Sequence, residues 1–155
     1  MKRVAVTGLG VISPVGNDVP TFWNALCSGT CGIGPITKFD ATDYPVKLAA
    51  EVRDFDPKQY MEKLDILHSD VYTHFAMAAA CQAVADSGIA GTLDAERVGV
   101  YIGSGIGGIA TFMTEHSKLL NRGPRRVSPY FIPMMIPNMA SSMIAMRYHF
   151  HGPAM

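Results

Sequence analysis

A short apolar segment that runs directly into a glycine-rich turn constrains the fold of this chain more than any other feature. Residues 97–109 read RVGVYIGSGIGGI, in which the alternating Val98, Val100 and Ile102 predict a strand. Four glycines follow within residues 103–108, and a helix is predicted over residues 109–120. Glycine permits positive φ angles and a close approach of the backbone to another group. A strand, a glycine turn and a helix in this order indicate a ligand-binding site.

The same glycines satisfy the GxGxxG pattern of dinucleotide-binding folds. In those folds an acidic residue that binds the ribose follows about twenty positions later. Here that region is residues 124–128 (PRRVS), which contains two arginines and no acidic residue. Nucleotide binding is therefore an alternative, and the favoured interpretation is that the turn packs closely against an acyl or pantetheine-like chain.

Composition limits the class of protein. The chain has 155 residues, is 48% apolar and 17% charged, and has a formal net charge of zero, which suits one domain with an apolar core and argues against nucleic acid binding over the whole surface. Three cysteines (Cys27, Cys31 and Cys81) are too few for a disulfide framework, so we expect a cytoplasmic protein. No second Cys or His pair follows Cys27 and Cys31 at ligand spacing, so no metal site is predicted.

Residues 127–146 carry no charged side chain and have the length of a membrane span. Pro129, Pro133 and Pro137 interrupt this stretch, which favours a buried strand or loop followed by a buried helix. We therefore predict no membrane span.

Periodicity and capping signals predict alternating strands and helices. We predict strands at residues 3–8, 46–52 and 98–102, helices at residues 18–26, 64–87, 109–120 and 138–150, and a further strand beginning at residue 154. Asn17 or Asp18 is the expected N-cap of the first helix, and Gly88 the expected C-cap of the longest. Residues 32–44 are expected to be irregular. This order fits half of a layered α/β fold, so the chain is expected to be incomplete.

Two clusters have both a structural and a functional interpretation. Four basic residues lie within nine positions and have no acidic residue among them: Lys118, Arg122, Arg125 and Arg126. They form either a solvated loop or a docking patch for an acidic partner. Three methionines follow helical spacing: Met139, Met143 and Met146. Core filling is the favoured interpretation, and an adaptable wall of an acyl pocket is the alternative.

No complete active site can be assembled from the remaining polar residues. His74 and Cys81 share a helix face, but a rise of about 1.5 Å per residue separates them by roughly 10 Å. Cys81 is therefore expected to be a core residue. Other candidates have no partner at useful spacing: His149, His151, Ser141 and Ser142.

Several longer segments identify a family. They are residues 4–18 (VAVTGLGVISPVGND), 86–88 (DSG), 102–108 (IGSGIGG) and 121–133 (NRGPRRVSPYFIP), with Asn138-Met139. Together they resemble the β-ketoacyl-acyl-carrier-protein synthases, in particular the elongating synthase II type, which has the thiolase-like fold. The resemblance extends from the first residues to Gly152-Pro153 and so covers essentially the whole chain.

The resemblance implies an αβαβα layered fold, of which residues 1–155 would form an N-terminal β-ketoacyl synthase domain. The family's full chain is much longer, and its nucleophilic cysteine and two catalytic histidines would lie beyond Met155. The activity implied is transfer of an acyl group from carrier protein to cysteine, followed by decarboxylation of malonyl-carrier protein and Claisen condensation. The chain as it stands is expected to be inactive.

Roles for residues within the chain also follow from the resemblance. Ile106 matches a gating residue at the bottom of the acyl pocket, and Gly105, Gly107 and Gly108 would give it room to move. Phe131 matches an aromatic residue that reaches across the dimer interface to line the partner's pocket. The remaining implied site residues are Met135 and Met139 beside Phe131, and Arg125 and Arg126 for docking of acidic carrier protein.

The resemblance further implies a cytoplasmic homodimer whose substrates are carried on the phosphopantetheine of acyl carrier protein, with no other cofactor. Residues 64–69 (LDILHS) are nearly uncharged where the family usually has basic residues, so no second carrier contact is predicted there. Ile136-Pro137 and Ser141-Ser142 also depart from the family's pattern, so no acyl-length preference is predicted. The alternatives are a catalytically silent partner similar to a chain-length factor, a polyketide ketosynthase, and a nucleotide-binding module.

Overall fold

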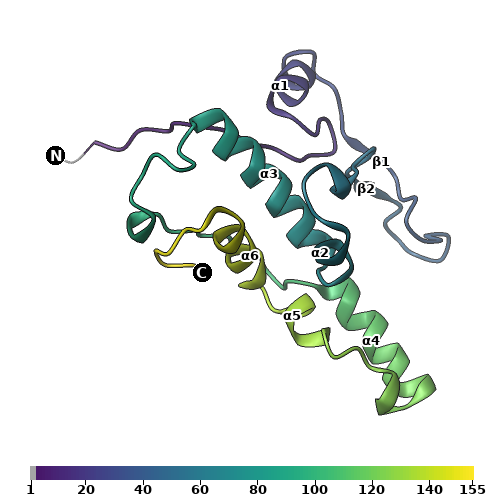
Figure 1. Cartoon of the computed structure of the whole chain (residues 1–155). Helices are drawn as coiled ribbons and strands as arrows, with labels where there is room; N and C mark the ends of the chain where they lie inside the picture. The colour runs from purple at the N-terminus through teal and green to yellow at the C-terminus, as the bar shows by residue number, and fades with distance from the viewer. Residues whose placement is uncertain (1–2) are drawn as a thin grey trace.

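The computed structural model describes residues 3–155, which form helices joined by long irregular segments (Figure 1). The helices are α1 (Val19–Cys27), α2 (Lys63–Leu67), α3 (Val71–Ser87), α4 (Ile109–Arg122), α5 (Phe131–Met135) and α6 (Met139–Tyr148). The short 3-10 helices are η1 (Pro57–Gln59), η2 (Ala95–Arg97) and η3 (Pro124–Arg126). The strands are β1 (Ile33–Pro35) and β2 (Leu48–Ala50).

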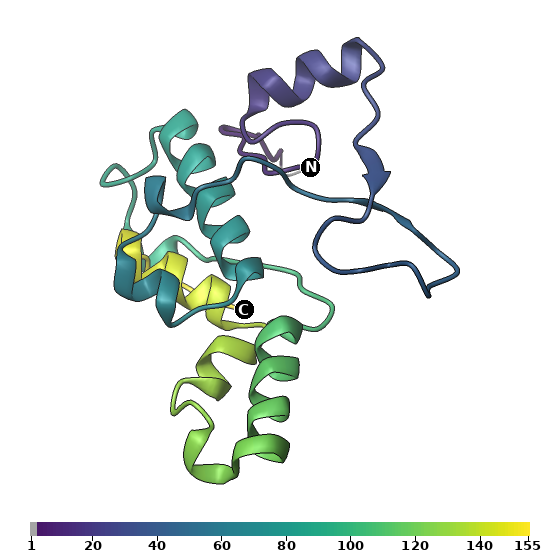
Figure 2. The ribbon, with the colours of Figure 1, turned by 90° about the vertical axis from the view of Figure 1, so that its right-hand side faces the viewer.

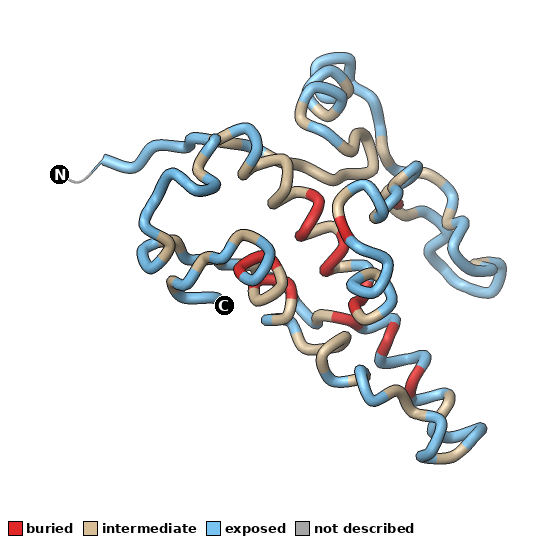
Figure 3. The backbone as a smooth tube through the Cα atoms, in the orientation of Figure 1, coloured by how far each residue is buried: buried red, intermediate tan, exposed pale blue. Residues whose placement is uncertain are grey.

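Helix α3 is the central element of the molecule. Its middle is rich in alanine, so neighbouring segments can approach it from several sides. α6 packs directly against it, and Met61, Met77 and Ile144 form the buried apolar cluster. Figure 3 shows the buried residues gathered along α3, α6 and α4.

Three predicted helices are confirmed to within two residues of their bounds: those at residues 18–26, 109–120 and 138–150 correspond to α1, α4 and α6. The side chain of Asp18 caps α1 as expected, because its Oδ1 atom accepts a hydrogen bond from Thr21 N at 2.7 Å. α6 stops at Tyr148 because His149 adopts a left-handed conformation with φ of 53°.

The prediction of one helix over residues 64–87 is wrong, because the chain breaks between α2 and α3. Asp70 has extended backbone angles, φ −95° and ψ 165°. Ser69 Oγ donates to Asp65 O, and His74 Nε2 lies 3.3 Å from Ile66 O. Polar side chains therefore replace helical backbone hydrogen bonds at the break. The predicted C-cap is confirmed, since Gly88 closes α3 with φ of 65°.

The predicted strands are only partly formed. Val100 and Ala154 make a parallel bridge, in which Val100 N donates to Pro153 O at 2.8 Å and Met155 N donates to Val100 O at 3.0 Å. The segment expected to begin a strand at residue 154 thus pairs with the predicted strand over residues 98–102. β2 lies within the predicted strand at residues 46–52 and pairs antiparallel with β1, which lies in a region predicted to be irregular.

The prediction of a strand at residues 3–8 is wrong for the described structure. Residues 3–7 are exposed, and only from Gly8 onward does the chain lie against α3, where Leu9 N donates to Asp86 Oδ2 at 2.9 Å and Val11 N donates to Gln82 Oε1 at 3.1 Å. A β-ladder requires a neighbouring strand, and residues 3–8 have none within residues 3–155.

Much apolar surface is uncovered. The accessible surface is 10767 Å², whereas a compact protein of 16.7 kDa would expose about 7,600 Å². Val4 and Val6 are 95% and 81% exposed, and Leu120 is 71% exposed. Large apolar surfaces of the described residues are therefore exposed to solvent. Part of this surface is exposed because α4 and α5 project away from the rest of the molecule (Figure 2).

Candidate functional site

The glycine turn (residues 103–108) has an anchored end. Gly107 has φ of +77°, and a Cβ atom there would collide with Met135 O. A Cβ atom on Gly108 would collide with Met134 O, and Gly108 N donates to Met135 O at 2.8 Å. Gly107 and Gly108 are thus required by the close approach of the turn to the C-terminal end of α5.

The other end of the glycine turn is open. A Cβ atom on Gly103 or Gly105 would have no atom within 4 Å, and the side chain of Ile106 is 65% exposed. Ser104 Oγ accepts a hydrogen bond from Gly107 N at 3.0 Å, which folds the turn back on itself. Packing in the described structure therefore explains two of the three glycines assigned to the site and not Gly105.

A buried carboxylate occupies the N-terminus of α4. Asp70 is 8% exposed, and its Oδ2 atom accepts from Thr111 N at 2.9 Å and from Thr111 Oγ1 at 2.6 Å. In dinucleotide-binding folds the pyrophosphate lies at the N-terminus of the helix that follows the glycine turn. A carboxylate already bonded to the Thr111 amide and hydroxyl opposes that use, so the geometry disfavours the nucleotide-binding alternative.

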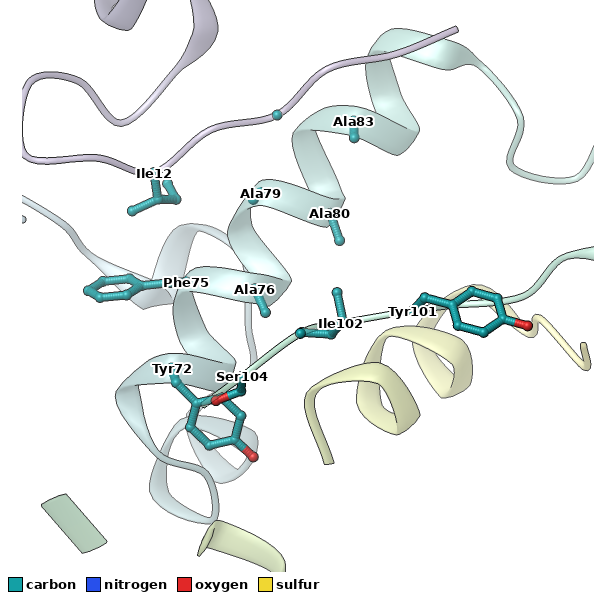
Figure 4. Close-up of a pocket in the computed structure, with 12 residues that line it drawn as sticks. Ile12, Tyr72, Phe75, Ala76, Ala79, Ala80, Ala83, Tyr101, Ile102 and Ser104 are labelled. Carbon is teal, nitrogen blue, oxygen red and sulfur yellow. The ribbon is translucent and has the colours of Figure 1, made fainter. Parts of the chain in front are cut away.

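A groove of about 550 Å³ lies along α3, between residues 10–12 and residues 101–104 (Figure 4). Its floor consists of small side chains of one helix: Ala76, Ala79, Ala80 and Ala83. Tyr72 lines the groove beside Ser104, and Phe75 lines it on the side of Ile12 (Figure 4). Tyr72 Oη donates to Ile136 O at 2.6 Å. The groove was not predicted from the sequence.

The site residues expected to form an acyl pocket are only partly brought together. Met135 contacts the glycine turn through its carbonyl group, as described above. Phe131 is half-buried at the start of α5, with its ring centre 6.1 Å from that of Phe112 on α4. Met139 begins α6 and donates its amide to Ile136 O at 3.3 Å. Ile106, Phe131, Met135 and Met139 do not line the α3 groove.

Arg125 and Arg126 lie far from the groove, in η3 at the tip of the projecting α4–α5 pair (Figure 1). Both side chains are exposed, and neither makes an ion pair with a residue of the described chain. Lys118, which the sequence placed in the same basic cluster, differs from them because its Nζ atom lies 2.6 Å from Glu115 Oε1.

Glu115 was not predicted from the sequence to have a role. It is 5% exposed, and its Oε2 atom accepts a hydrogen bond from Ser128 N at 2.7 Å. The hydrogen bond from Lys118, and after it that from Ser128 N, lower the pKa of Glu115. The i, i+3 spacing of Glu115 and Lys118 was the available signal for the ion pair, but nothing in the sequence indicated the bond to Ser128.

The structure also excludes a Cys–His pair of the kind considered for His74 and Cys81. His74 Nε2 lies 3.1 Å from Ser69 Oγ, and burial lowers the pKa of His74. Cys81 instead lies beside Tyr148. The pKa of Tyr148 is raised mainly by burial and, to a smaller extent, by Cys81.

Within residues 3–155, no three His, Cys, Asp or Glu side chains are grouped as metal ligands. None of the described helices has the length and hydropathy of a membrane span.

Comparisons with known proteins agree with this architecture. The family model described as "Beta-ketoacyl synthase, N-terminal domain" matches residues 1–155. A 3-oxoacyl-[acyl-carrier-protein] synthase 2 of Coxiella burnetii (strain RSA 493 / Nine Mile phase I) is 50% identical over 153 residues, which cover 98% of this chain and 37% of the relative. The protein of the same name from Synechocystis sp. (strain ATCC 27184 / PCC 6803 / Kazusa) is 44% identical over 153 residues, again 98% of this chain and 37% of the relative.

Two solved structures have the same fold. The ishigamide ketosynthase/chain length factor superposes with a TM-score of 0.80 at 27% identity, over 97% of this chain and 38% of that one. A type II polyketide ketosynthase, solved bound to a hexaketide and in complex with its acyl carrier protein, gives a TM-score of 0.80 at 25% identity, over 97% and 40%. The helices of this chain thus follow the thiolase-like arrangement expected from the sequence, and the chain spans 37% of the length of the synthases it matches. The chain belongs to the β-ketoacyl synthase family and corresponds to its N-terminal domain.

Proposed function

We propose that this chain is part of a 3-oxoacyl-[acyl-carrier-protein] synthase of fatty acid biosynthesis. The observation that carries the proposal is the 50% identity to the Coxiella burnetii synthase 2, which extends over 98% of the chain. We place this reaction in the cytoplasm, in line with the small number of cysteines in the sequence.

In the proposed reaction, a cysteine thiol encoded beyond Met155 attacks an acyl thioester on carrier protein, and the carrier's phosphopantetheine thiol leaves. Malonyl-carrier protein then loses CO₂, which breaks a carbon–carbon bond and leaves an enolate. The enolate attacks the acyl-cysteine carbonyl, a new carbon–carbon bond forms, and the cysteine thiolate is released. No cofactor besides the carrier's phosphopantetheine enters these steps, and residues 1–155 supply none of the reacting groups.

This chain contributes binding surfaces in the proposed enzyme. Ile106 would act as the gate of the acyl pocket, which is supported by its place in the open end of a turn that is anchored at Gly107 and Gly108. Phe131, Met135 and Met139 would line the pocket, with Phe131 reaching into that of a second copy in a homodimer. The exposed apolar surface of the projecting α4–α5 pair supports such an assembly.

Arg125 and Arg126 would bind an acidic acyl carrier protein. Their exposure at the tip of a projecting structure, with no acidic partner among the described residues, supports this role. One similar structure holds a ketosynthase in complex with its carrier protein.

A second candidate is a catalytically silent partner of a ketosynthase. The ishigamide ketosynthase/chain length factor, with a TM-score of 0.80, supports this alternative. Its 27% identity is well below the 50% identity to the synthase 2, which favours the enzyme and the fatty acid pathway over a polyketide one.

Reading the gene beyond the codon for Met155 tests the proposal directly. We expect an open frame that continues into a strand ending in cysteine, with two histidines further on. A glutamine at the cysteine position would favour the silent partner instead. A stop codon directly after Met155 would contradict both and identify the chain as a remnant.

Replacement of Ile106 with Phe tests the gate. The larger ring fills the space into which the side chain must move, so the whole product of the gene should lose activity with long acyl acceptors and keep it with short ones. We expect the ratio of kcat/KM values for short and long acceptors to rise by about tenfold or more. An unchanged ratio would contradict the assignment of the gate.

A further inference from the structure

Glu115 connects α4 to the segment that carries the two arginines. We call residues 123–128 the basic turn. Glu115 is buried in the side of α4, and one of its carboxylate oxygens accepts from Ser128 N at the far end of this turn, at 2.7 Å. The second oxygen binds Lys118 Nζ at 2.6 Å. A single carboxylate thus holds the end of the turn and one turn of the helix together.

The other hydrogen bonds of the basic turn are local. Gly123 N donates to Leu119 O at 3.1 Å, Arg126 N to Gly123 O at 3.1 Å, and Val127 N to Pro124 O at 3.3 Å. These bonds shape the turn but do not tie its end back to α4. In the described structure only the bond between Ser128 N and Glu115 does so. A hydrogen bond from an amide to a buried carboxylate is one of the stronger kinds.

Glu115 also affects the charge of the surface. Its carboxylate neutralises Lys118, so Arg125 and Arg126 remain as the exposed unpaired cations of the turn. Loss of Glu115 would free Lys118 and make the tip of α4 more positive. On charge alone, this change should strengthen binding of an acidic protein. If Glu115 instead acts by positioning the turn, its loss should weaken the binding of an acidic protein.

We propose that Glu115 is a positioning residue for carrier-protein docking: it fixes the end of the basic turn against α4, so that Arg125 and Arg126 are held in one arrangement. This inference rests on the proposed function, in which the two arginines bind acyl carrier protein. Arginines on a fixed stretch of backbone lose less conformational freedom on binding than arginines on a mobile one, so they contribute more to the affinity.

Two variants with the same charge separate position from charge. Glu115→Ala removes the acceptor of Ser128 N, whereas Glu115→Gln keeps a carbonyl oxygen that accepts this bond. Both remove one negative charge. The measurement is the dissociation constant of the host's acyl carrier protein for the whole product of the gene, by titration calorimetry at low and at physiological salt. Thermal unfolding verifies that each variant is folded.

We expect Glu115→Ala to bind the carrier about fivefold more weakly than Glu115→Gln, because two surface charge contacts lose their geometry. Glu115→Gln should bind like the original protein or slightly more tightly. Equal binding by the two variants would overturn the inference. If the original protein itself does not bind the carrier, the proposed docking role of the arginines fails, and this outcome is distinct from the first.

A second pair of variants covers the case in which Glu115→Ala does not fold. Ser128→Pro removes the donor and leaves Glu115 and Lys118 intact. Val127 tolerates a following proline, since its φ is −70° and its ψ is 135°. Ser128→Ala is the control, because it keeps the amide. We expect weaker carrier binding for Ser128→Pro only, and equal binding by the two Ser128 variants would contradict the role of this bond.

Discussion

Helices α3 and α4 are similar in length, but different forces hold them. The buried residues of α3 are Thr73, His74, Met77 and Ala78, and Met77 belongs to the apolar cluster that includes Ile144 of α6. The buried residues of α4 are Thr111 and Glu115. Both are polar, and both act through hydrogen bonds to other segments: Thr111 with Asp70 and Glu115 with Ser128.

This difference matters for function because the two helices carry different parts of the proposed enzyme. α3 forms the floor of a groove, and non-directional packing of its apolar side chains against α6 adds to the hydrogen bonds that its polar side chains make. α4 joins the glycine turn to the basic turn, and its apolar side chains such as Met113 and Leu120 are largely exposed. Its position therefore depends on a few directional bonds that respond to single substitutions and to pH. Substitutions in each helix, and a change of pH, test this contrast.

Met77→Ala should have the largest effect on stability. Met77 is 3% exposed in the core, and its removal leaves a cavity between α3 and α6. A change of this kind costs about 2–5 kcal/mol of the free energy of unfolding. Denaturant unfolding of the whole gene product measures it. Met146→Ala on α6, where the side chain is 63% exposed, is the control and should cost less than about 0.5 kcal/mol. Equal losses would show that α3 is not held by this core.

Asp70→Ala should destabilise the start of α4. The substitution leaves Thr111 N and Thr111 Oγ1 without an acceptor in a buried site, which costs about 1–3 kcal/mol. Hydrogen exchange of the Thr111 amide should become faster, while amides in the middle of α3 keep their protection. Asp18→Ala removes an exposed N-cap from α1 and is the matched control. Unchanged exchange at Thr111 would contradict the role of Asp70.

The smallest expected effect is a pH dependence of the contact between α4 and the basic turn. The pKa of Glu115 lies below its ordinary value of 4.5 in the folded protein, so the ionised form is the one that the fold stabilises. This stabilisation is present above the ordinary value and is lost as the pH falls through the lowered pKa. The protection factor of the Ser128 amide should therefore decrease in that range.

Glu115→Gln is the control for this titration, because its side chain does not ionise. The protection of Ser128 should then vary little with pH. A decrease of the same size in both proteins would show that another group is responsible.

The contrast between the helices also explains what the sequence could predict. Local signals were sufficient where a residue acts on its own segment: Asp18 caps α1, Gly88 ends α3, and α4 begins after the glycine turn at residue 109. The break between α2 and α3 was missed because the stretch is long and apolar, and a few polar side chains at Ser69 and His74 outweigh that periodicity.

The polar anchors of α4 could not be predicted, since each joins residues that are distant along the chain. Asp70 and Thr111 are 41 positions apart, and Asp70 was expected to lie inside a helix. The strand at residues 3–8 was predicted from side-chain alternation alone, whereas a strand also requires a partner that the pattern does not specify. The resemblance to a family, which depends on longer segments, was the one inference from the sequence that reached beyond local structure, and the comparisons confirm it.

The most direct test of the proposed function is a condensation assay with the whole product of the gene, an acyl-carrier protein and malonyl-carrier protein. We expect release of CO₂ and formation of a 3-oxoacyl thioester two carbons longer than the starting acyl chain. The absence of this product with every acyl chain length tried, from a folded protein that binds the carrier, would contradict the assignment as a condensing enzyme.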